Sequence, residues 1–339
     1  MPELDRLRRQ LLGALGVAGI GAVAPAWAQK TAPLPPAVGR WPQQEVELTV
    51  PFPAGGNSSL LGKTMARQFA RETGQPMRLE YRGGGGGTAG ATYVAKAPAD
   101  GSHLLMGGVS MLASRAVQLQ LDVDLYEDFA PLALVAQMPL VLLVSPRRLN
   151  VRTWPELLAE LRRKPQRYRY ASAGIGTSNH VAGEWFKLET GALLEHVPYK
   201  GSGPAMLDVA QGNVELMLDG LASALPHLQA DRLRAVFVTG PQRSPLLPDV
   251  PTAHELGLDD FQSMPWYGIF APRATPASVQ ARAIEVFRSM AGAPAVQKEW
   301  RAMGATWPGL YGPEFKQFLQ DEMKHWARIV RETGAAARP

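Results

Sequence analysis

Two stretches of the sequence share one plan. Residues 50–74 read VPFPAGGNSSLLGKTMARQFARETG, and residues 170–191 read YASAGIGTSNHVAGEWFKLETG. Each passes from the end of an apolar strand through a turn rich in Gly and Ser into an amphipathic helix that stops at Glu-Thr-Gly. Gly74 and Gly191 are predicted to take the left-handed conformation that closes such helices. Both turns place glycines and hydroxyls at a helix N-terminus, where free N–H groups and the helix dipole attract an anion. Any α/β protein repeats strand–helix units, so the repeat alone does not prove a shared function.

The rest of the chain alternates short apolar runs with helical patterns. This alternation predicts an α/β fold with parallel sheets and helices on their faces. A final helix is expected at about 313–331, with Phe315, Leu319, Trp326 and Val330 on the face that docks on the core. The expected strands are 46–50, 77–81, 103–106, 141–144, 168–171, 194–197, 214–218 and 233–238.

The N-terminus has the pattern of a secretory signal. Arg6, Arg8 and Arg9 precede an apolar run at 11–23, and Ala26-Trp27-Ala28 offers small residues for cleavage. We therefore expect a signal peptide at 1–28, cleaved after Ala28, then a loose Pro-rich leader at 29–40 and a mature protein in the periplasm. The paired arginines also resemble a twin-arginine signal, so the export route stays open between the two systems.

Composition excludes several classes of protein. Of the 339 residues, 46% are hydrophobic and 19% are charged, which is globular rather than disordered. The net charge of +5 is scattered; its densest group, at 162–164, reads as a solvated helix face rather than a nucleic-acid site. The sequence has no Cys, which excludes disulfides, thiolate catalysis and cysteine zinc sites.

Two glycine motifs imitate nucleotide sites without meeting their requirements. Gly56 and Gly62-Lys63-Thr64 enclose five residues, whereas a phosphate-binding P-loop has four. Residues 85–90 satisfy GxGxxG, but five consecutive glycines match many such patterns, and no acidic residue ends the strand at 103–106. We expect no nucleotide cofactor, and we expect the loop at Gly85 to approach a ligand closely.

No catalytic or metal-binding constellation stands out in the sequence. Residues 108–112 miss the last glycine of the GxSxG elbow, and the six histidines have no metal-ligand spacing. Ser178 and His180 are near in sequence, which does not make them a nucleophile–base pair. His180 reads equally well as a polar wall of a cleft or as a satisfied helix residue. The sequence favours binding without turnover, with an exported hydrolase using Ser110 or Ser178 as the alternative.

Several longer segments carry a family resemblance. The segments are 51–56, 83–91, 99–101, 172–180, 198–201, 243–252 and 268–272. They are similar to the tripartite tricarboxylate transporter substrate-binding proteins, or Bug receptors, and the matches are collinear from about 46 to 334. This resemblance implies a two-lobed periplasmic binding protein fold of the type II kind, with two crossing strands between parallel-core sheets. One lobe is expected at 41–139 plus 237–339 and the other at 140–236.

The resemblance also implies a ligand site. A small carboxylate would be held between the lobes by backbone groups and bridging waters of the two turns. On one side these groups belong to Phe52, Ala54, Gly55, Gly56, Asn57 and Ser58, and on the other to Gly174, Gly176, Thr177 and Ser178, with Gly85 nearby. The remainder of the cleft would draw on Ser110, His180, Lys200, Ser202 and Asp219.

The sequence departs from the family pattern at a few positions. Ser59 stands where the family usually has Asp, and Gly220 replaces a frequent Asn. Tyr81 and Gly83 replace a frequent Asn and Pro. Losing the Asp removes a negative group that we expect near the cleft, so amine-bearing ligands should become less favoured than plain or aromatic carboxylates.

The function that the resemblance implies is solute capture. A monomeric receptor would close on a carboxylate and deliver it to the membrane permease of a tripartite tricarboxylate transporter, with no metal or cofactor. The alternative within the same fold is an extracytoplasmic sensor that passes its closed form to a signalling partner.

Overall fold

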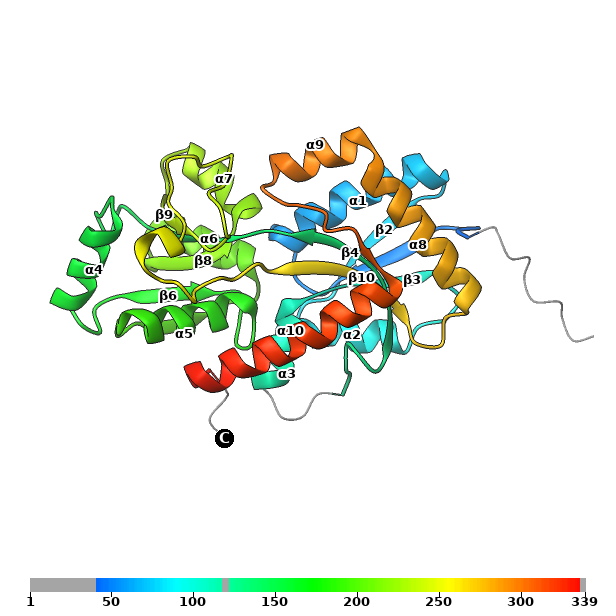
Figure 1. The fold of residues 1–339 in the computed structure, drawn as a ribbon, viewed down its shortest axis with the longest axis horizontal. Coiled ribbons are helices and arrows are strands. Elements are labelled where there is room, and N and C mark those ends of the chain that lie inside the picture. The colour runs from blue at the N-terminus through cyan, green and yellow to red at the C-terminus, as the bar shows by residue number, and fades with distance from the viewer. Residues whose placement is uncertain (1–40, 118–121, 336–339) are drawn as a thin grey trace, which may run out of the picture. The chain divides into compact units, whose positions relative to one another are not determined.

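The computed structural model describes residues 41–117 and 122–335. The predicted signal peptide and Pro-rich leader lie outside these residues. The described chain builds two mixed β-sheets with helices packed against them, an α/β fold of two lobes (Figure 1). We call the part built on the six-stranded sheet the first lobe and the part built on the five-stranded sheet the second lobe. The exact residue limits predicted for the lobes remain a prediction.

The six-stranded sheet of the first lobe has the order β11-β4-β10-β3-β1-β2. One side of it is parallel, because β1 pairs in parallel with both β2 and β3. β10 is antiparallel to β3 and β4, and β11 is antiparallel to β4. The strands are β1 (Val46–Val50), β2 (Met77–Tyr81), β3 (His103–Gly108), β4 (Phe129–Gln137), β10 (Trp266–Pro272) and β11 (Leu310–Tyr311).

The five-stranded sheet of the second lobe has the order β7-β6-β8-β5-β9. β6 pairs in parallel with β7 and β8, whereas β5 is antiparallel to β8 and β9. Each sheet thus has a parallel side of three strands and an antiparallel side that the strand–helix alternation did not predict. The strands are β5 (Leu140–Val144), β6 (Arg169–Ser172), β7 (Glu195–Pro198), β8 (Leu216–Gly220) and β9 (Arg234–Val238).

Helices cover the sheets because neighbouring strand residues point to opposite faces. In β3, Leu104 and Met106 join the apolar cluster of α1, α8 and α9, while Leu105 joins that of α2, α3 and α10. Within the described residues, none of the helices is both long and apolar enough to cross a membrane. The helices are α1 (Asn57–Thr73), α2 (Thr88–Ala95), α3 (Val109–Val117), α4 (Trp154–Arg163), α5 (Ser178–Thr190), α6 (Ser202–Gln211), α7 (Leu221–Gln229), α8 (Ala277–Gly292), α9 (Pro294–Ala302) and α10 (Gly312–Thr333); short 3₁₀ turns lie at Gly85–Gly87 and His254–Leu256.

Two connections join the sheets. β4 leads into β5 through residues 138–139, and the chain returns from β9 to β10 through residues 239–265. The sequence analysis found β5 but missed β4 and β10. The run from 129 to 144 is almost entirely buried, so it shows continuous apolar residues rather than the alternation that identifies a half-exposed strand.

The predicted helix ends are confirmed. Gly74 closes α1 with φ 72°, and Gly191 closes α5 with φ 66°, both in the left-handed region. The final helix, α10, buries Phe315, Leu319, Trp326 and Val330 as predicted. It packs on α3 in the first lobe and on α5 in the second, and so it touches both lobes.

The packing of α5 on β6 depends on a glycine. A Cβ at Gly183 would lie 2.1 Å from the ring of Tyr170. In an exposed helix interior, Gly→Ala stabilises by up to about 1 kcal/mol. Here overpacking should cost about 1–3 kcal/mol instead. We therefore expect Gly183→Ala to lower the midpoint of urea unfolding.

Gly292→Ala is the matched control, because nothing lies within 4 Å of a Cβ at that end of α8. It should leave the midpoint unchanged or raise it. A Gly183→Ala protein as stable as the wild type would contradict the close packing of Tyr170 on α5.

Candidate functional site

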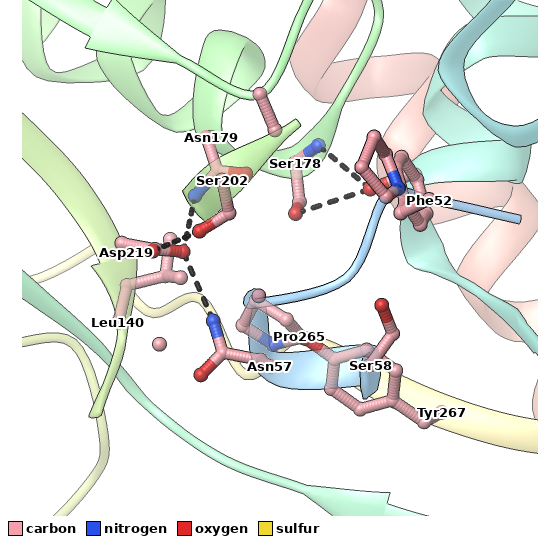
Figure 2. A pocket seen from close by; sticks show the side chains of 15 residues that line it. Phe52, Asn57, Ser58, Leu140, Ser178, Asn179, Ser202, Asp219, Pro265 and Tyr267 are labelled. Atoms are coloured by element: carbon pink, nitrogen blue, oxygen red, sulfur yellow. Dashed lines mark hydrogen bonds between the residues drawn. The ribbon is translucent and has the colours of Figure 1, made fainter. Parts of the chain in front are cut away.

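A small cavity, with a volume of about 40 Å³, lies where the two lobes meet (Figure 2). The first lobe contributes the turn before α1 and the start of α3, and the second lobe contributes the starts of α5 and α6 and the end of β8. Segments at the connections between the sheets complete it. The lining residues are Phe52, Pro53, Gly56, Asn57, Ser58, Ser110, Leu140, Ala173, Ser178, Asn179, Ser202, Asp219, Gly220, Pro265 and Tyr267.

The turn before α1 brings a bare helix start to the cavity. Gly55 has φ 102°, and Gly56 is an N-cap residue without a side chain to accept from the first turn. Within the described chain, the N–H groups of Asn57 and Ser58 donate no hydrogen bond. Such unpaired N–H groups, together with the helix dipole, favour an anion at this point.

The turn before α5 is more fully bonded. The Thr177 N–H donates to the Gly174 carbonyl at 3.2 Å, and the Gly176 N–H donates to His180 Nδ1 at 3.2 Å. The Ser178 N–H donates to Ser110 Oγ of the first lobe at 3.2 Å. A ligand oxygen that took the Ser178 N–H would therefore replace the Ser110 hydroxyl.

Asp219 lies at the centre of the lining and is only 2% exposed. Its carboxylate accepts hydrogen bonds from Asn57 Nδ2 at 3.1 Å and from Asn179 Nδ2 at 2.9 Å. It also accepts from Ser202 Oγ, and from Ser223 Oγ at 2.8 Å. These four donors come from the first turns of α1, α5, α6 and α7. Burial raises the pKa of Asp219, and the hydroxyl and amide donors oppose that rise.

Two hydroxyls face the cavity without a protein partner. Neither Ser58 Oγ nor Tyr267 Oη makes a hydrogen bond within the described residues, and both residues line the cavity. Burial, and then the charge of Asp219, raise the pKa of Tyr267, so its phenol stays protonated at neutral pH. Both groups can donate to a ligand oxygen.

Comparison with known proteins decides the family. A family model described as the tripartite tricarboxylate transporter family receptor matches residues 61–335. The chain belongs to this family. It is 33% identical over 298 residues to protein BugT of Bordetella pertussis, covering 87% of this chain and 91% of BugT.

Solved structures of similar proteins agree with the family. R. palustris Rpa4515 with adipate has a TM-score of 0.84 and 31% identity, covering 87% of this chain and 98% of that one. MatC (Rpa3494) from Rhodopseudomonas palustris with bound malate has a TM-score of 0.80 and 30% identity, covering 86% and 100%. The two-lobed fold is thus that of periplasmic binding proteins, and the chain is a receptor of the tricarboxylate transporter family.

The structure brings together half of the site residues predicted for this receptor. Phe52, Gly56, Asn57, Ser58, Ser110, Ser178, Ser202 and Asp219 line the cavity. The other eight, Ala54, Gly55, Gly85, Gly174, Gly176, Thr177, His180 and Lys200, are not among its lining residues.

These eight residues have other surroundings. Ala54 and Gly55 are exposed and lie against Gly203 of α6, and Lys200 and Gly85 are exposed. Gly174 and Thr177 bond within their own turn, whereas the Gly176 N–H donates to His180 and the Gly176 carbonyl accepts from Ser114 Oγ of α3 at 3.1 Å. The glycine run, which was expected to approach a ligand closely, instead packs closely on α3. A Cβ at Gly86 would lie 1.9 Å from Ser114 Oγ.

Sequence reasoning missed seven lining residues: Pro53, Leu140, Ala173, Asn179, Gly220, Pro265 and Tyr267. Asn179 could have been found, since it lies between Ser178 and His180 in a first helical turn, where amide side chains often bond. Tyr267 and Pro265 belong to β10 and the segment before it, which were not recognised. Leu140 is one apolar residue within a long apolar run.

Ser59 does not lie where the sequence analysis placed it. It is fully buried, and its hydroxyl is 3.1 Å from the hydroxyl of Tyr81 rather than in the cavity lining. Ser59 itself is thus not among the lining residues, and the effect of lacking an Asp at this position stays a prediction.

His180 faces away from the serines. Its ring packs 4.3 Å from that of His196, and its Nδ1 accepts from Gly176. Ser110 Oγ and Ser178 Oγ instead lie 3.3 Å from each other. Among the described residues, no histidine bonds to either serine, and no cluster of three or more His, Asp or Glu could hold a metal ion.

His180 and His196 stabilise the turn before α5 on the side away from the cavity. His196 Nε2 lies 2.6 Å from Ser172 Oγ, which accepts from the Gly174 N–H at 3.1 Å. Burial, and then the charge of His180, lower the pKa of His196 to about 4. Burial also lowers the pKa of His180. Protonation of either ring is therefore disfavoured in the folded protein.

This burial predicts a pH dependence of stability. Between pH 6.5, the ordinary histidine value, and pH 4, the unfolded chain binds more protons than the native state at His196. The free energy of unfolding should therefore fall as the pH drops through that window. His196→Gln should flatten the fall by up to about 3 kcal/mol, measured by urea unfolding at several pH values.

His254→Gln serves as control, because its side chain is 62% exposed. The His254 ring lies 2.9 Å from Asp259, and because an exposed ion pair contributes at most about 1 kcal/mol, this variant should change the pH profile far less than His196→Gln does. Equal profiles for His196→Gln and the wild type would show that the His196 ring is free to protonate in the folded protein.

Proposed function

We propose that the protein captures a small organic acid in the cavity and delivers it to the membrane permease of a tripartite tricarboxylate transporter. The observation that carries this proposal is the bare start of α1, whose Asn57 and Ser58 N–H groups adjoin the free hydroxyls of Ser58 and Tyr267. Similar proteins with adipate and with malate support it.

The available donors suffice for useful affinity. A hydrogen bond to a charged group contributes about 1.5–3 kcal/mol. Three or four such bonds contribute about 4.5–12 kcal/mol in total, a range that includes the roughly 8 kcal/mol of micromolar binding before the cost of association is subtracted. Among the described residues, no Lys or Arg lines the cavity, so neutral donors and the dipole of α1 would hold the acid.

The carboxylate of Asp219 is not an acceptor for the ligand. A carboxylate offers about four lone-pair positions, and four protein donors already occupy those of Asp219. A ligand ammonium would find no acceptor there. The preference for plain acids over amino acids thus stays our proposal, on the basis of Asp219 instead of Ser59.

Capture proceeds by a population shift between open and closed forms. An acid that touches both lobes adds its differential contacts to the closed form, and the permease then recognises the closed receptor that holds the acid. The same closed form would serve a signalling partner if the receptor acts as a sensor. We propose a monomer without catalytic activity, exported to the periplasm and cleaved after Ala28.

Calorimetric titration with adipate and with malate tests the capture of acids. At least one acid should bind, while adipamide and 1,6-hexanediamine, which lack the carboxylate, should not. Ser58→Ala removes a donor to the acid and should weaken binding about tenfold or more. The neighbouring Ser59→Ala is the control, since that hydroxyl faces Tyr81, and it should leave the affinity within a few-fold.

Binding of the diamine in preference to every acid tried would contradict the proposal. So would equal losses of affinity in Ser58→Ala and Ser59→Ala, because the loss would then be unrelated to the cavity.

A further inference from the structure

We infer that Asn57 and Gly220 form a latch that holds the two lobes closed without a ligand. Asn57 is the first residue of α1 in the first lobe, and Gly220 ends β8 in the second. This inference rests on the proposed function for its biological purpose, but the latch itself consists of protein groups alone. The side chain of Asn57 acts in it as a positioning group, whereas the backbone N–H of Asn57 stays available to the acid.

The amide of Asn57 bonds to the second lobe with both of its ends. Nδ2 donates to Asp219 Oδ1 at 3.1 Å (Figure 2), and Oδ1 accepts from the Ser223 N–H at 3.0 Å. The residue is 4% exposed, so water does not compete for these bonds. One side chain of the first lobe thus satisfies a buried carboxylate and a backbone N–H of the second.

The bond to Ser223 caps a helix across the lobes. Helix α7 starts after Gly220, which has no side chain to accept from the first turn. Ser223 is the third residue of α7, and the N–H at that position is one that a capping side chain usually satisfies. Asn57 supplies the missing acceptor from the other lobe. If the lobes part, α7 loses this cap and Asp219 loses one of its four donors.

Gly220 provides the space that the latch needs. A Cβ at this position would lie 2.7–2.8 Å from the amide atoms of Asn57. Its backbone has φ −63° and ψ 146°, which any residue adopts. The glycine is therefore required by the close approach of Asn57 and not by backbone conformation, so Ala at 220 would displace the amide without straining the chain.

The latch would raise the affinity for any acid that needs the closed form. The apparent dissociation constant equals the intrinsic one divided by the fraction of protein that is closed. Losing a hydrogen bond to a charged group and a helix cap should lower the closed-to-open ratio about tenfold or more. The gain in affinity that an acid obtains from the latch cannot exceed this change in the closed-to-open ratio.

Distances between spin labels test the latch in the absence of any acid. The chain has no Cys, so Lys63→Cys on α1 and Leu207→Cys on α6 place one label on each lobe at exposed positions. Double electron–electron resonance should show mainly the short distance of the closed form. Asn57→Ala and Gly220→Ala should each shift the population toward a longer distance.

The double variant provides the decisive comparison. With Ala at 57 the Cβ at 220 has room, so Asn57→Ala/Gly220→Ala should match Asn57→Ala alone. Gly292→Ala controls for a general effect of Gly→Ala and should match the wild type. Gly220→Ala retains every hydrogen-bonding group, and so it keeps the test valid if Asn57→Ala lowers stability.

Three results would overturn the latch: a labelled wild type that is mainly open, single variants with unchanged distances, or effects of the two substitutions that add in the double variant. None of these measurements contains an acid. A failure of the acid titrations would therefore leave the latch standing, and a failure of the latch would leave acid capture standing.

Discussion

The buried carboxylate of Asp219 organises the meeting point of four helices. Helix N-termini carry partial positive charge and would repel one another if they converged without an anion between them. Asp219 supplies that anion from β8, and side chains from the first turns of α1, α5, α6 and α7 donate to it. A buried charge is tolerated only when it is hydrogen-bonded in this way. The position of the cavity follows from this arrangement.

The arrangement also decides what the cavity can recognise. The side chains of Asn57, Asn179, Ser202 and Ser223 donate to Asp219 and are not available to a ligand. Donors that stay available are the N–H groups at the start of α1 and the hydroxyls of Ser58 and Tyr267. Apolar side chains such as Phe52, Leu140 and Pro265 share the rest of the lining with the polar side chains of Ser110 and Ser178. Under the proposed function, such a site would bind an acid group without a formal positive charge, and the carbon chain attached to that group would meet both polar and apolar surface.

The sequence predicted the parts of this structure that follow from local chemistry. The glycine stops at Gly74 and Gly191 and the buried face of α10 were correct because caps and helical periodicity act over a few residues. β4 and β10 were not predicted because burial on both faces removes the alternation of apolar and polar residues that identifies a strand. Asn57, through its backbone, and Asp219 were predicted as ligand contacts; the bond between their two side chains was not predicted. That pairing arises only when the two lobes meet, and no local pattern records it.

The close contact between Gly220 and Asn57 should make substitutions at these two distant positions of the chain depend on each other during evolution. As long as Asn57 fills the space beside it, residue 220 is not free to acquire a side chain, although its backbone angles would allow one. Among related receptors, a larger residue at the position of Gly220 should accompany a smaller one at the position of Asn57. Covariation of positions 57 and 220 among related sequences would thus indicate that the closed form has been selected during evolution.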